Sequence, residues 1–380
     1  MSLKAFQKQA AAHFHPSRYQ LFRAPGRINL IGEHTDYNHG YCLPAAIAPS
    51  IYLAIGPAAE TEVISLDRHN NWYPGQIRSL PDWSRYFSGV LELLREKGYS
   101  WPYFKLVFGG GDLPSGAGLS SSSAICCGFI SALNAFGRLG LSLQQLTAFS
   151  VRAEKASGLE GGMMDQIAIL NGEAGQALFI DCSNWSYERI PVSIPGLSWL
   201  IADTRVKHDL VLTDYNNRAF TCRNILSKAK SLYPDLEQVS QIIGERLTKV
   251  VSVLDPNERM LLHYIEEENA RVRNMVSAIR AQNPRVMGNL LFAGHEGLRR
   301  QYRVSCPELD FMVTFARNSG WSYGARMVGG GFGGCTIHLL DESKRDRYRR
   351  GLERAFKNRF GYDPAVFEAV IGDGVRELEV

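Results

Sequence analysis

One segment of this 380-residue sequence constrains its fold more than any other: the glycine- and serine-rich stretch GDLPSGAGLSSSSA at residues 111–124. An apolar run at 104–108 precedes it and predicts a strand. Small and apolar residues at helical spacing follow and predict a helix over about 120–136, capped by serine. Glycine amides beside a helix N-terminus suit a phosphate group. Taken alone, a simple loop with a serine cap explains the segment about equally well.

The phosphate-binding interpretation does not extend to the Walker type, because no Gly-Lys pair occurs anywhere in the chain. A second glycine cluster, at residues 329–335, formally matches the dinucleotide pattern GxGxxG. That pattern must open a helix, whereas this cluster lies between strand-like runs at 327–328 and 336–340. We therefore expect a turn in which glycine lets two loops, or a loop and a nucleotide, come into contact.

Chain length and the order of the predicted elements indicate two packed domains. The first half alternates short strands with glycine- and proline-rich turns, whereas long helical patterns dominate the second half. Neither a repeat nor a low-complexity linker separates the halves, which are expected to meet near residue 195 in a mixed α+β fold. The other predicted elements are strands at 52–55, 176–180 and 199–203 and helices at 143–156, 217–231, 236–250 and 259–280.

Charge and cysteine content argue against several classes of protein. The net charge of +4 is small, and an acid interrupts the one dense basic stretch at 344–350, so no nucleic-acid surface is expected. Seven cysteines without CxxC spacing are expected to be reduced thiols. The polar N-terminus and the short apolar stretch at 124–136 predict neither a signal peptide nor a membrane span, hence a cytoplasmic protein.

Residues 23–44 carry five polar side chains within twelve positions. These are Arg27, Glu33, His34, Asp36 and Asn38. A surface turn would explain a random polar cluster, but Ile28, Leu30 and Ile31 should carry the strand inward and place the acids beside buried structure. Carboxylates with an imidazole suit the hydroxyl groups of a sugar, because each group rejects a ligand that lacks the matching hydroxyl.

Two further acids have alternative interpretations. Asp165 lies in GGMMDQ at residues 161–166, among glycines and apolar methionines. A carboxylate in apolar surroundings binds a proton more readily, as a general base requires, but a helix-capping aspartate explains the pattern equally well. Glu154, on the preceding predicted helix, could reach a metal ion, although such a glutamate is more often solvated.

Together these segments resemble the signatures of the GHMP kinase superfamily, and the first resembles its galactokinase branch. GRINLIGEHTDYN is nearly the branch signature, PSGAGLSSSSA is similar to the ATP loop, and GARMVGGGFGGC is similar to the third motif. GGMMDQ, HDLVLTDYNNR and YRVSCPELD also match, in the family's order. The resemblance implies an α+β, two-domain GHMP kinase fold. Residues 1–195 would form a domain like ribosomal protein S5 domain 2, and residues 196–380 a ferredoxin-like domain.

The resemblance also implies roles for individual residues. Asp165 would contact the 1-hydroxyl of the sugar and accept its proton, and Arg27 would stabilise negative charge on the transferring phosphoryl group. Ser120 and Glu154 would hold Mg²⁺. The implied sugar contacts are Glu33, His34, Asp36, Asp165 and Tyr215, and the implied ATP contacts are Gly116, Gly118, Ser120 and Ser121.

The implied activity is ATP-dependent phosphorylation of the 1-hydroxyl of α-D-galactose, giving galactose 1-phosphate and ADP. One alternative is a kinase for a related sugar, such as N-acetylgalactosamine or arabinose. Another is a non-catalytic sugar-sensing paralogue. Such a protein should show a damaged phosphate loop (the segment at residues 111–124), whereas Gly116 and Gly118 are present in this chain. The expected partners are galactose and ATP, with Mg²⁺ as cofactor and without nucleic acid or membrane. We expect a monomer.

Overall fold

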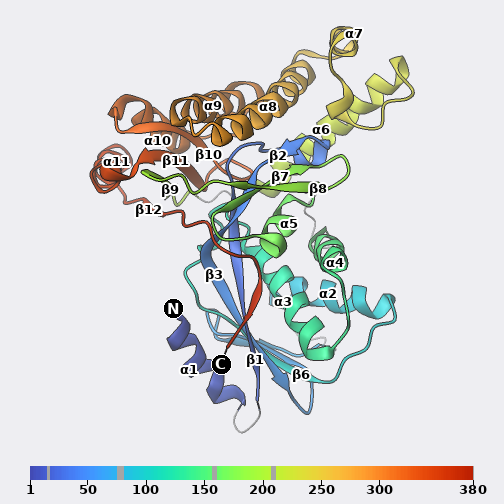
Figure 1. Cartoon of the computed structure of the whole chain (residues 1–380). Helices are drawn as coiled ribbons and strands as arrows, with labels where there is room; N and C mark the ends of the chain where they lie inside the picture. The colour runs from blue at the N-terminus through green and yellow to red at the C-terminus, as the bar shows by residue number, and fades with distance from the viewer. Residues whose placement is uncertain (15–17, 75–80, 156–160, 207–210, 380) are drawn as a thin grey trace.

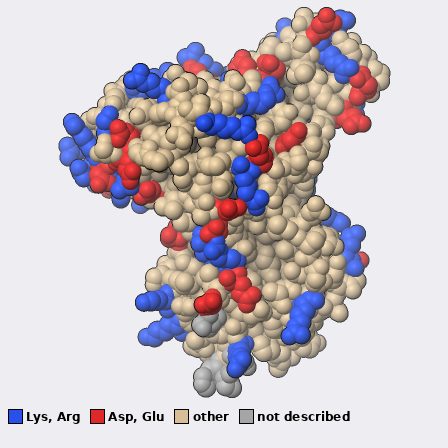
Figure 2. Space-filling view, viewed as in Figure 1, with Lys and Arg blue, Asp and Glu red and all other residues tan. Residues whose placement is uncertain are grey.

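The protein is described by a computed structural model that covers residues 1–14, 18–74, 81–155, 161–206 and 211–379. Two lobes are joined at a narrower waist, with the N- and C-termini both on the lower lobe (Figure 1). Basic and acidic side chains are intermixed on the face shown in Figure 2. The predicted mixed α+β architecture is confirmed.

The lower lobe is built on a six-stranded sheet in the order β13-β1-β3-β6-β4-β5. Neighbouring strands are antiparallel except β4 and β6. Its strands are β1 (Gln20–Asn29), β3 (Pro44–Pro57), β4 (Glu62–Ser65), β5 (Asn70–Trp72), β6 (Phe104–Gly109) and β13 (Arg376–Leu378). The last strand of the chain thus pairs with the first, as Figure 1 shows in red beside blue. The division near residue 195 stays a prediction.

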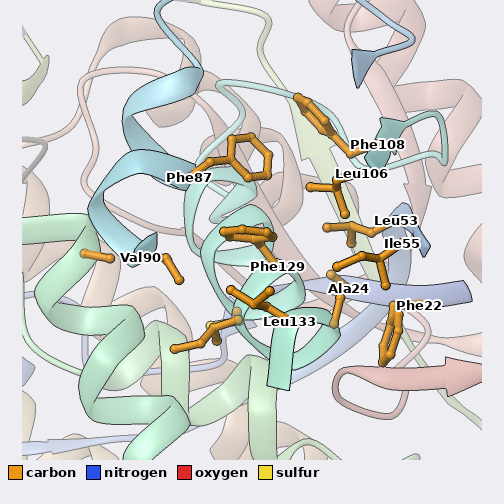
Figure 3. Close-up of a cluster of buried hydrophobic side chains, with 14 of the residues drawn as sticks. Phe22, Ala24, Leu53, Ile55, Phe87, Val90, Leu106, Phe108, Phe129 and Leu133 are labelled. Atoms are coloured by element: carbon orange, nitrogen blue, oxygen red, sulfur yellow. The ribbon is translucent and has the colours of Figure 1, made fainter. Parts of the chain in front are cut away.

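Helices pack on this sheet and enclose the first hydrophobic core. They are α2 (Ser84–Glu96), α3 (Ser121–Gly137), α4 (Leu143–Lys155) and α5 (Met164–Asn171), while α1 (Leu3–Phe14) packs on β3 and β6. Figure 3 shows Phe87 of α2 and Phe129 of α3 facing side chains from β1, β3 and β6. A Cβ atom at Gly128 would lie 2.7 Å from the Ala24 and Leu53 side chains. Glycine at this position therefore lets α3 lie directly on the sheet, which fixes the loop before α3.

The upper lobe is built on an antiparallel sheet in the order β10-β11-β9-β12. Its strands are β9 (Leu197–Asp203), β10 (Ser322–Met327), β11 (Cys335–Asp341) and β12 (Ala365–Glu368). Its helical segments are α6 (Val211–Leu232), η2 (Val239–Gln241), α7 (Glu245–Val253), α8 (Pro256–Arg280), α9 (Pro284–Gly297), η3 (Leu298–Tyr302), α10 (Pro307–Ser319), η4 (Glu342–Lys344) and α11 (Arg345–Phe360). A small sheet, β2-β7-β8, contacts both α5 and α8 and so lies between the lobes. Its strands are β2 (Tyr41–Cys42), β7 (Gln176–Asp181) and β8 (Ser186–Pro191).

Most predicted elements overlap the observed ones, although the strand predicted at 52–55 covers only part of β3 and the helix predicted at 217–231 begins six residues after α6 does. The helix predicted over 236–250 is wrong in its first half. Residues 239–241 form the short helix η2, and α7 begins only at Glu245. Gly244 between them has φ +59° and ψ −130°, a backbone conformation that ends any helix. Ala156, the last residue of the predicted helix 143–156, lies outside the described residues, as does the start of HDLVLTDYNNR.

All seven cysteines lie within the described residues, where each is buried and none forms a disulfide. The Sγ atoms of Cys42 and Cys182 lie 3.6 Å apart, well beyond the length of a covalent bond. Among the helices that the structure describes, none combines the length and the apolar character needed to cross a bilayer.

Truncation of Phe129 should destabilise the protein strongly. The side chain is fully buried, with its ring centroid 5.0 Å from that of Phe87. We expect Phe129→Ala to lower the free energy of unfolding by about 3–5 kcal/mol, because the α3–sheet core loses an aromatic ring and keeps a cavity. Urea denaturation measures this change. Phe220→Ala, on an exposed position of α6, is the control and should change stability by less than about 0.5 kcal/mol. Equal effects of the two variants would contradict this view of the core.

Candidate active site

A cavity of about 580 Å³ lies between the two lobes. It is lined by the loop after β1, by the N-termini of α3 and α5, by α6 and by the glycine turn between β10 and β11. The implied site residues meet in this one place. Arg27, Glu33, His34, Asp36, Gly116, Gly118, Ser120, Ser121, Glu154, Asp165 and Tyr215 all line the cavity.

The loop after β1 is buried as the sequence predicts. Ile28, Leu30 and Ile31 are fully buried and anchor the chain in the core between the lobes. The side chains that follow are therefore held away from solvent: Glu33 is 2% exposed and Asp36 is 6% exposed. The interpretation as a surface turn is wrong, because the apolar residues that flank the polar ones have no route to the surface.

Arg27, which is buried, and Asp165, which is half-buried, form a two-pronged ion pair in the lining of the cavity. The guanidinium Nε and Nη2 donate to the two carboxylate oxygens of Asp165 at 2.6 and 2.8 Å, and Nη1 donates to the carbonyl of Gly118 at 2.7 Å. The hydroxyl of Ser120 donates to the same carboxylate. Burial alone would lower the pKa of Arg27, but Asp165, Glu33 and Asp36 together raise it, so this side chain stays charged. One guanidinium thus joins β1, the phosphate loop and α5.

This geometry removes the helix-cap interpretation of Asp165 and leaves its role as a general base a prediction. The helix α5 begins after Met163, and Asp165 occupies its first turn. The Asp165 carboxylate is bound by Arg27 and Ser120, so it does not serve as a helix cap. Its surroundings are also ionic, although its neighbours in sequence are apolar.

Glu154 is buried rather than solvated. Ser122 and Ser123 donate to its two oxygens at 2.6 and 2.7 Å, and Gln166 donates to one of them at 2.5 Å. Burial raises the pKa of Glu154, and nearby Asp165 raises it further, whereas the serine hydroxyls act in the opposite direction. The carboxylate therefore lies at the N-terminus of α3, bound by the two serines that directly follow Ser120 and Ser121 in the chain. Within the described residues, no three His, Cys, Asp or Glu side chains converge as a ready-made metal site.

Glu33 has partners that sequence reasoning did not identify. Asn29 donates to Oε2 at 2.6 Å, Arg326 donates to the same oxygen, and the amide of Gly329 donates to Oε1 at 2.9 Å. Arg326 is fully buried. Arg326 is a charged residue within an apolar strand, in the segment GARMVGGGFGGC, and this was the sequence signal that could have identified it. A carboxylate has about four acceptor positions, so one position, on Oε1, stays available to a ligand.

The glycine turn between β10 and β11 touches the phosphate loop, which confirms the contact expected from the sequence. A Cβ atom at Gly329 would lie 2.9 Å from the carbonyl oxygen of Gly118, and one at Gly334 would lie 3.1 Å from that of Ala117. Both glycines have positive φ, +81° and +77°. Side chains at these positions would force the two loops apart and open the cavity.

His34, Asp36 and Tyr215 form the remaining wall. Burial raises the pKa of Asp36 to about 6, and the charge of Asp165 adds to the effect. Burial lowers the pKa of His34 to about 3, so its ring is neutral at neutral pH. The ring of Tyr215 packs against His34 at 5.3 Å between centroids. The wall thus combines an aromatic face with hydrogen-bonding groups, a combination that suits a small polyhydroxylated ligand.

Comparisons with known proteins identify the class to which this fold belongs. Residues 85–173 match the family model "GHMP kinases N terminal domain", and residues 275–358 match "GHMP kinases C terminal". The mevalonate kinase of Methanococcus jannaschii has the same fold, with a TM-score of 0.67 and 17% identity over 95% of this chain and 99% of that one. The implied two-domain GHMP kinase fold is confirmed.

More specific matches identify the branch. Residues 4–57 match the "Galactokinase galactose-binding signature". Galactokinases of Thermotoga neapolitana and Streptomyces coelicolor are 34% and 36% identical, each covering 94% of this chain and 99% and 94% of their own lengths. The galactokinase of Lactococcus lactis, solved in complex with galactose, superposes with a TM-score of 0.93 at 28% identity, over 99% of this chain and all of that one. The chain belongs to the galactokinase family.

Neutralising Asp36 should stabilise the protein in a pH-dependent way. Its pKa rises from 3.8 to about 6 on folding, so the folded state holds the proton more tightly and stability falls as pH rises between these values. The difference corresponds to about 3 kcal/mol. We therefore expect Asp36→Asn to gain stability over the parent, by an amount that grows from pH 4 to pH 6 and then stays constant.

Urea unfolding at pH 4, 5, 6, 7 and 8 measures this gain. Asp341→Asn is the control, because hydrogen bonds from Ser343 lower the pKa of Asp341 and the sign reverses: this variant should lose stability as pH rises. A gain for Asp36→Asn that is flat or shrinks toward high pH would contradict the buried-acid assignment.

Proposed function

We propose that this protein phosphorylates the 1-hydroxyl of α-D-galactose with ATP, giving galactose 1-phosphate and ADP. The observation that carries the proposal is the single cavity in which Arg27 joins Asp165 to the carbonyl of Gly118 in the phosphate loop. The acid that would act on the sugar hydroxyl and the loop that would bind the phosphates are therefore held together by the same guanidinium group. Membership of the galactokinase family supports the choice of sugar.

Asp165 and Arg27 divide the chemistry in this proposal. The sugar O1 attacks the γ-phosphorus, the bond from phosphorus to the ADP oxygen breaks, and the hydroxyl proton passes to the Asp165 carboxylate. Arg27 fixes that carboxylate with two hydrogen bonds and carries the positive charge that stabilises the transferring group. Holding the reactants in line supplies on the order of 7–11 kcal/mol of the barrier.

The phosphates of ATP would lie on the loop that precedes α3. Gly116 and Gly118 have φ +74° and +75°, Ser120 has φ +59°, and all three residues line the cavity. Ser121 begins α3, whose N-terminus carries partial positive charge. These features favour an anion at the position where the family places its nucleotide.

The charge of the cavity supports a bound Mg²⁺. Its described lining residues include four carboxylates, Glu33, Asp36, Glu154 and Asp165, but only two guanidinium groups, Arg27 and Arg85. A triphosphate would add further negative charge, so a divalent cation is needed to offset it. Glu154 with the Ser120 hydroxyl and phosphate oxygens would hold it, because Mg²⁺ takes one or two carboxylates together with substrate phosphates. The bound ion would neutralise charge on the β- and γ-phosphates.

The sugar would lie against the remaining wall. Asp36 accepts hydrogen bonds from hydroxyl groups, Glu33 offers the free acceptor position on Oε1, and Tyr215 supplies an apolar face. Galactose and glucose differ only in the orientation of the 4-hydroxyl, and we assign its recognition to Asp36. Each buried partner left unpaired costs about 1–3 kcal/mol, which rejects glucose roughly 10- to 100-fold per contact.

Release of ADP from MgATP in the presence of a panel of monosaccharides tests the function directly. We expect galactose to be phosphorylated well, 2-deoxygalactose less well, and glucose with a kcat/KM at least roughly 10-fold lower. N-acetylgalactosamine and arabinose complete the panel. A higher kcat/KM for either of them would assign another sugar, comparable values for glucose and galactose would remove the role of Asp36, and no ADP release with any sugar would contradict a kinase.

Asp165→Asn should abolish turnover while it preserves sugar binding. The amide keeps the size of the side chain but cannot take the proton, so we expect kcat to fall about 10²- to 10⁴-fold. Galactose affinity, measured by calorimetry, should change only a few-fold. Asp235→Asn is a matched control, because it removes an Arg–Asp pair of the same chemistry, with Arg246, on the surface. A kcat for Asp165→Asn within a few-fold of the parent would remove Asp165 from the base role.

A further inference from the structure

A chain of hydrogen bonds runs from His34 at the cavity wall into the interior of the upper lobe. His34 Nδ1 lies 2.8 Å from the hydroxyl of Tyr37, which lies 2.9 Å from the hydroxyl of Tyr302. The Tyr302 oxygen lies 3.3 Å from Cys222 Sγ. Only His34 lines the cavity, and the other three members stand behind it. The sequence motif YRVSCPELD, which contains Tyr302, has no role in the chemistry described above.

Packing holds the His34 ring in one orientation. Its centroid lies 4.8 Å from that of Tyr302 and 5.3 Å from that of Tyr215. The backbone of His34 has φ +61°, an unfavourable conformation for a residue with a side chain, and Asn38 fixes it by donating to the His34 carbonyl at 2.7 Å. Such backbone strain persists only where the surrounding structure determines it, and it is common at ligand sites.

The chemistry of the chain decides which way its protons point. Burial lowers the pKa of His34 to about 3, an effect that the backbone of Gly330 partly offsets, so a neutral ring carries one N–H. Burial raises the pKa of Tyr37 and of Tyr302 well above the ordinary value, so both phenols keep their protons.

Two arrangements are then possible, and they differ at the ends of the chain. In one, Tyr302 donates to Tyr37 and Tyr37 donates to His34 Nδ1, an unprotonated imidazole nitrogen that is a good acceptor. In the other, His34 donates to Tyr37 and the last phenol donates to the sulfur of Cys222, which is a weak acceptor. The first arrangement is the stronger one, because a phenol hydroxyl donates to the imidazole nitrogen, which is a better acceptor than the cysteine sulfur. It leaves the ring proton on Nε2. Within the described part of the structure this nitrogen makes no hydrogen bond of good geometry, although the backbone of Gly330 lies close enough to the ring to raise its pKa.

We propose that Tyr37 and Tyr302 are positioning residues that fix His34 as the Nε2–H tautomer, so that His34 donates a hydrogen bond to an oxygen of the sugar. This role rests on the proposed function, because it assigns the bound sugar to this wall. It also divides recognition of the sugar between groups that accept hydrogen bonds and one group that donates. Asp36 and Glu33 require a hydroxyl that donates, whereas His34 requires only a lone pair.

The tautomer can be observed without any turnover. In ¹⁵N-histidine-labelled protein at pH 7, the two ring nitrogens of a neutral imidazole give separate resonances, and His34→Gln assigns those of His34. We expect the parent to show an unprotonated Nδ1 and a protonated Nε2. We expect Tyr37→Phe, which removes the hydroxyl that faces Nδ1, to shift both resonances toward a mixture of tautomers. A protonated Nδ1 in the parent, or an unchanged His34 spectrum in Tyr37→Phe, would overturn the proposal.

A matched variant separates this role from simple loss of stability. Tyr348 is a fully buried tyrosine whose hydroxyl lies 2.8 Å from Nδ1 of His338, and neither residue lines the cavity. Tyr348→Phe removes the same group from the same type of partner. It should leave the His34 resonances and the KM for galactose unchanged.

Kinetics give the second readout. We expect Tyr37→Phe to raise the KM for galactose roughly 5- to 50-fold, with kcat within about 3-fold of the parent, because a ground-state contact is weakened. Tyr302→Phe should act in the same direction with a smaller effect, since Tyr37 keeps its hydroxyl. A fall in kcat with unchanged KM would overturn the positioning role. Absence of sugar phosphorylation in the parent would instead remove the proposed function, and the tautomer measurement would still report on the chain of hydrogen bonds.

Discussion

The ion pair between Arg27 and Asp165 organises the rest of the cavity. The Arg27 side chain is 6% exposed and always charged, and Asp165 supplies the largest compensating charge, so removal of Asp165 would leave a buried charge less well compensated. Because Arg27 also holds the carbonyl of Gly118, the pair sets the distance between the phosphate loop and α5. Residues 27, 118 and 165 are far apart in sequence, so this one interaction ties three separate segments of the lower lobe together.

A second ion pair, between Glu33 and Arg326, connects the two lobes in a similar way. Arg326 belongs to β10 of the upper lobe, and Glu33 follows β1 of the lower lobe. The amide of Gly329 donates to the same carboxylate, so the glycine turn is fixed against the loop after β1. The hydroxyl of Tyr264 of α8 donates to the Glu33 carbonyl at 2.9 Å and reinforces the connection. A rigid contact between lobes suits a reaction that depends mainly on the relative position of two substrates.

The charge of the cavity as a whole disfavours a free anion. Its carboxylates outnumber its guanidinium groups among the described residues, and its one histidine is neutral. Asp36 has a raised pKa because it is buried near Asp165, so the folded protein keeps an energetically unfavourable charge where a ligand would bind. Such a group is a cost to stability that function explains, as polar groups at binding sites commonly are.

Local sequence determined much of this protein. Apolar spacing around residues 104–136 predicted β6 and α3 to within a residue, and the glycines at 329–334 predicted a turn between strands, because side-chain periodicity and positive φ are local properties. The polar residues of 27–36 were identified as a buried site from the apolar residues among them.

Only the tertiary structure decided how these groups are used. Asp165 has apolar neighbours in sequence, yet it is bound by Arg27 from 138 residues away. The sequence left Glu154 as either a metal ligand or a solvated helix residue, yet serines of another helix donate hydrogen bonds to its buried carboxylate. Tyr37 and Tyr302 carried no recognisable signal of their roles, and the signal at Arg326 did not indicate its partner, because the partners come from other segments of the chain. Residue type and spacing specify local conformation, but ionisation, hydrogen-bond direction and burial depend on atoms that only the folded chain brings within 3 Å.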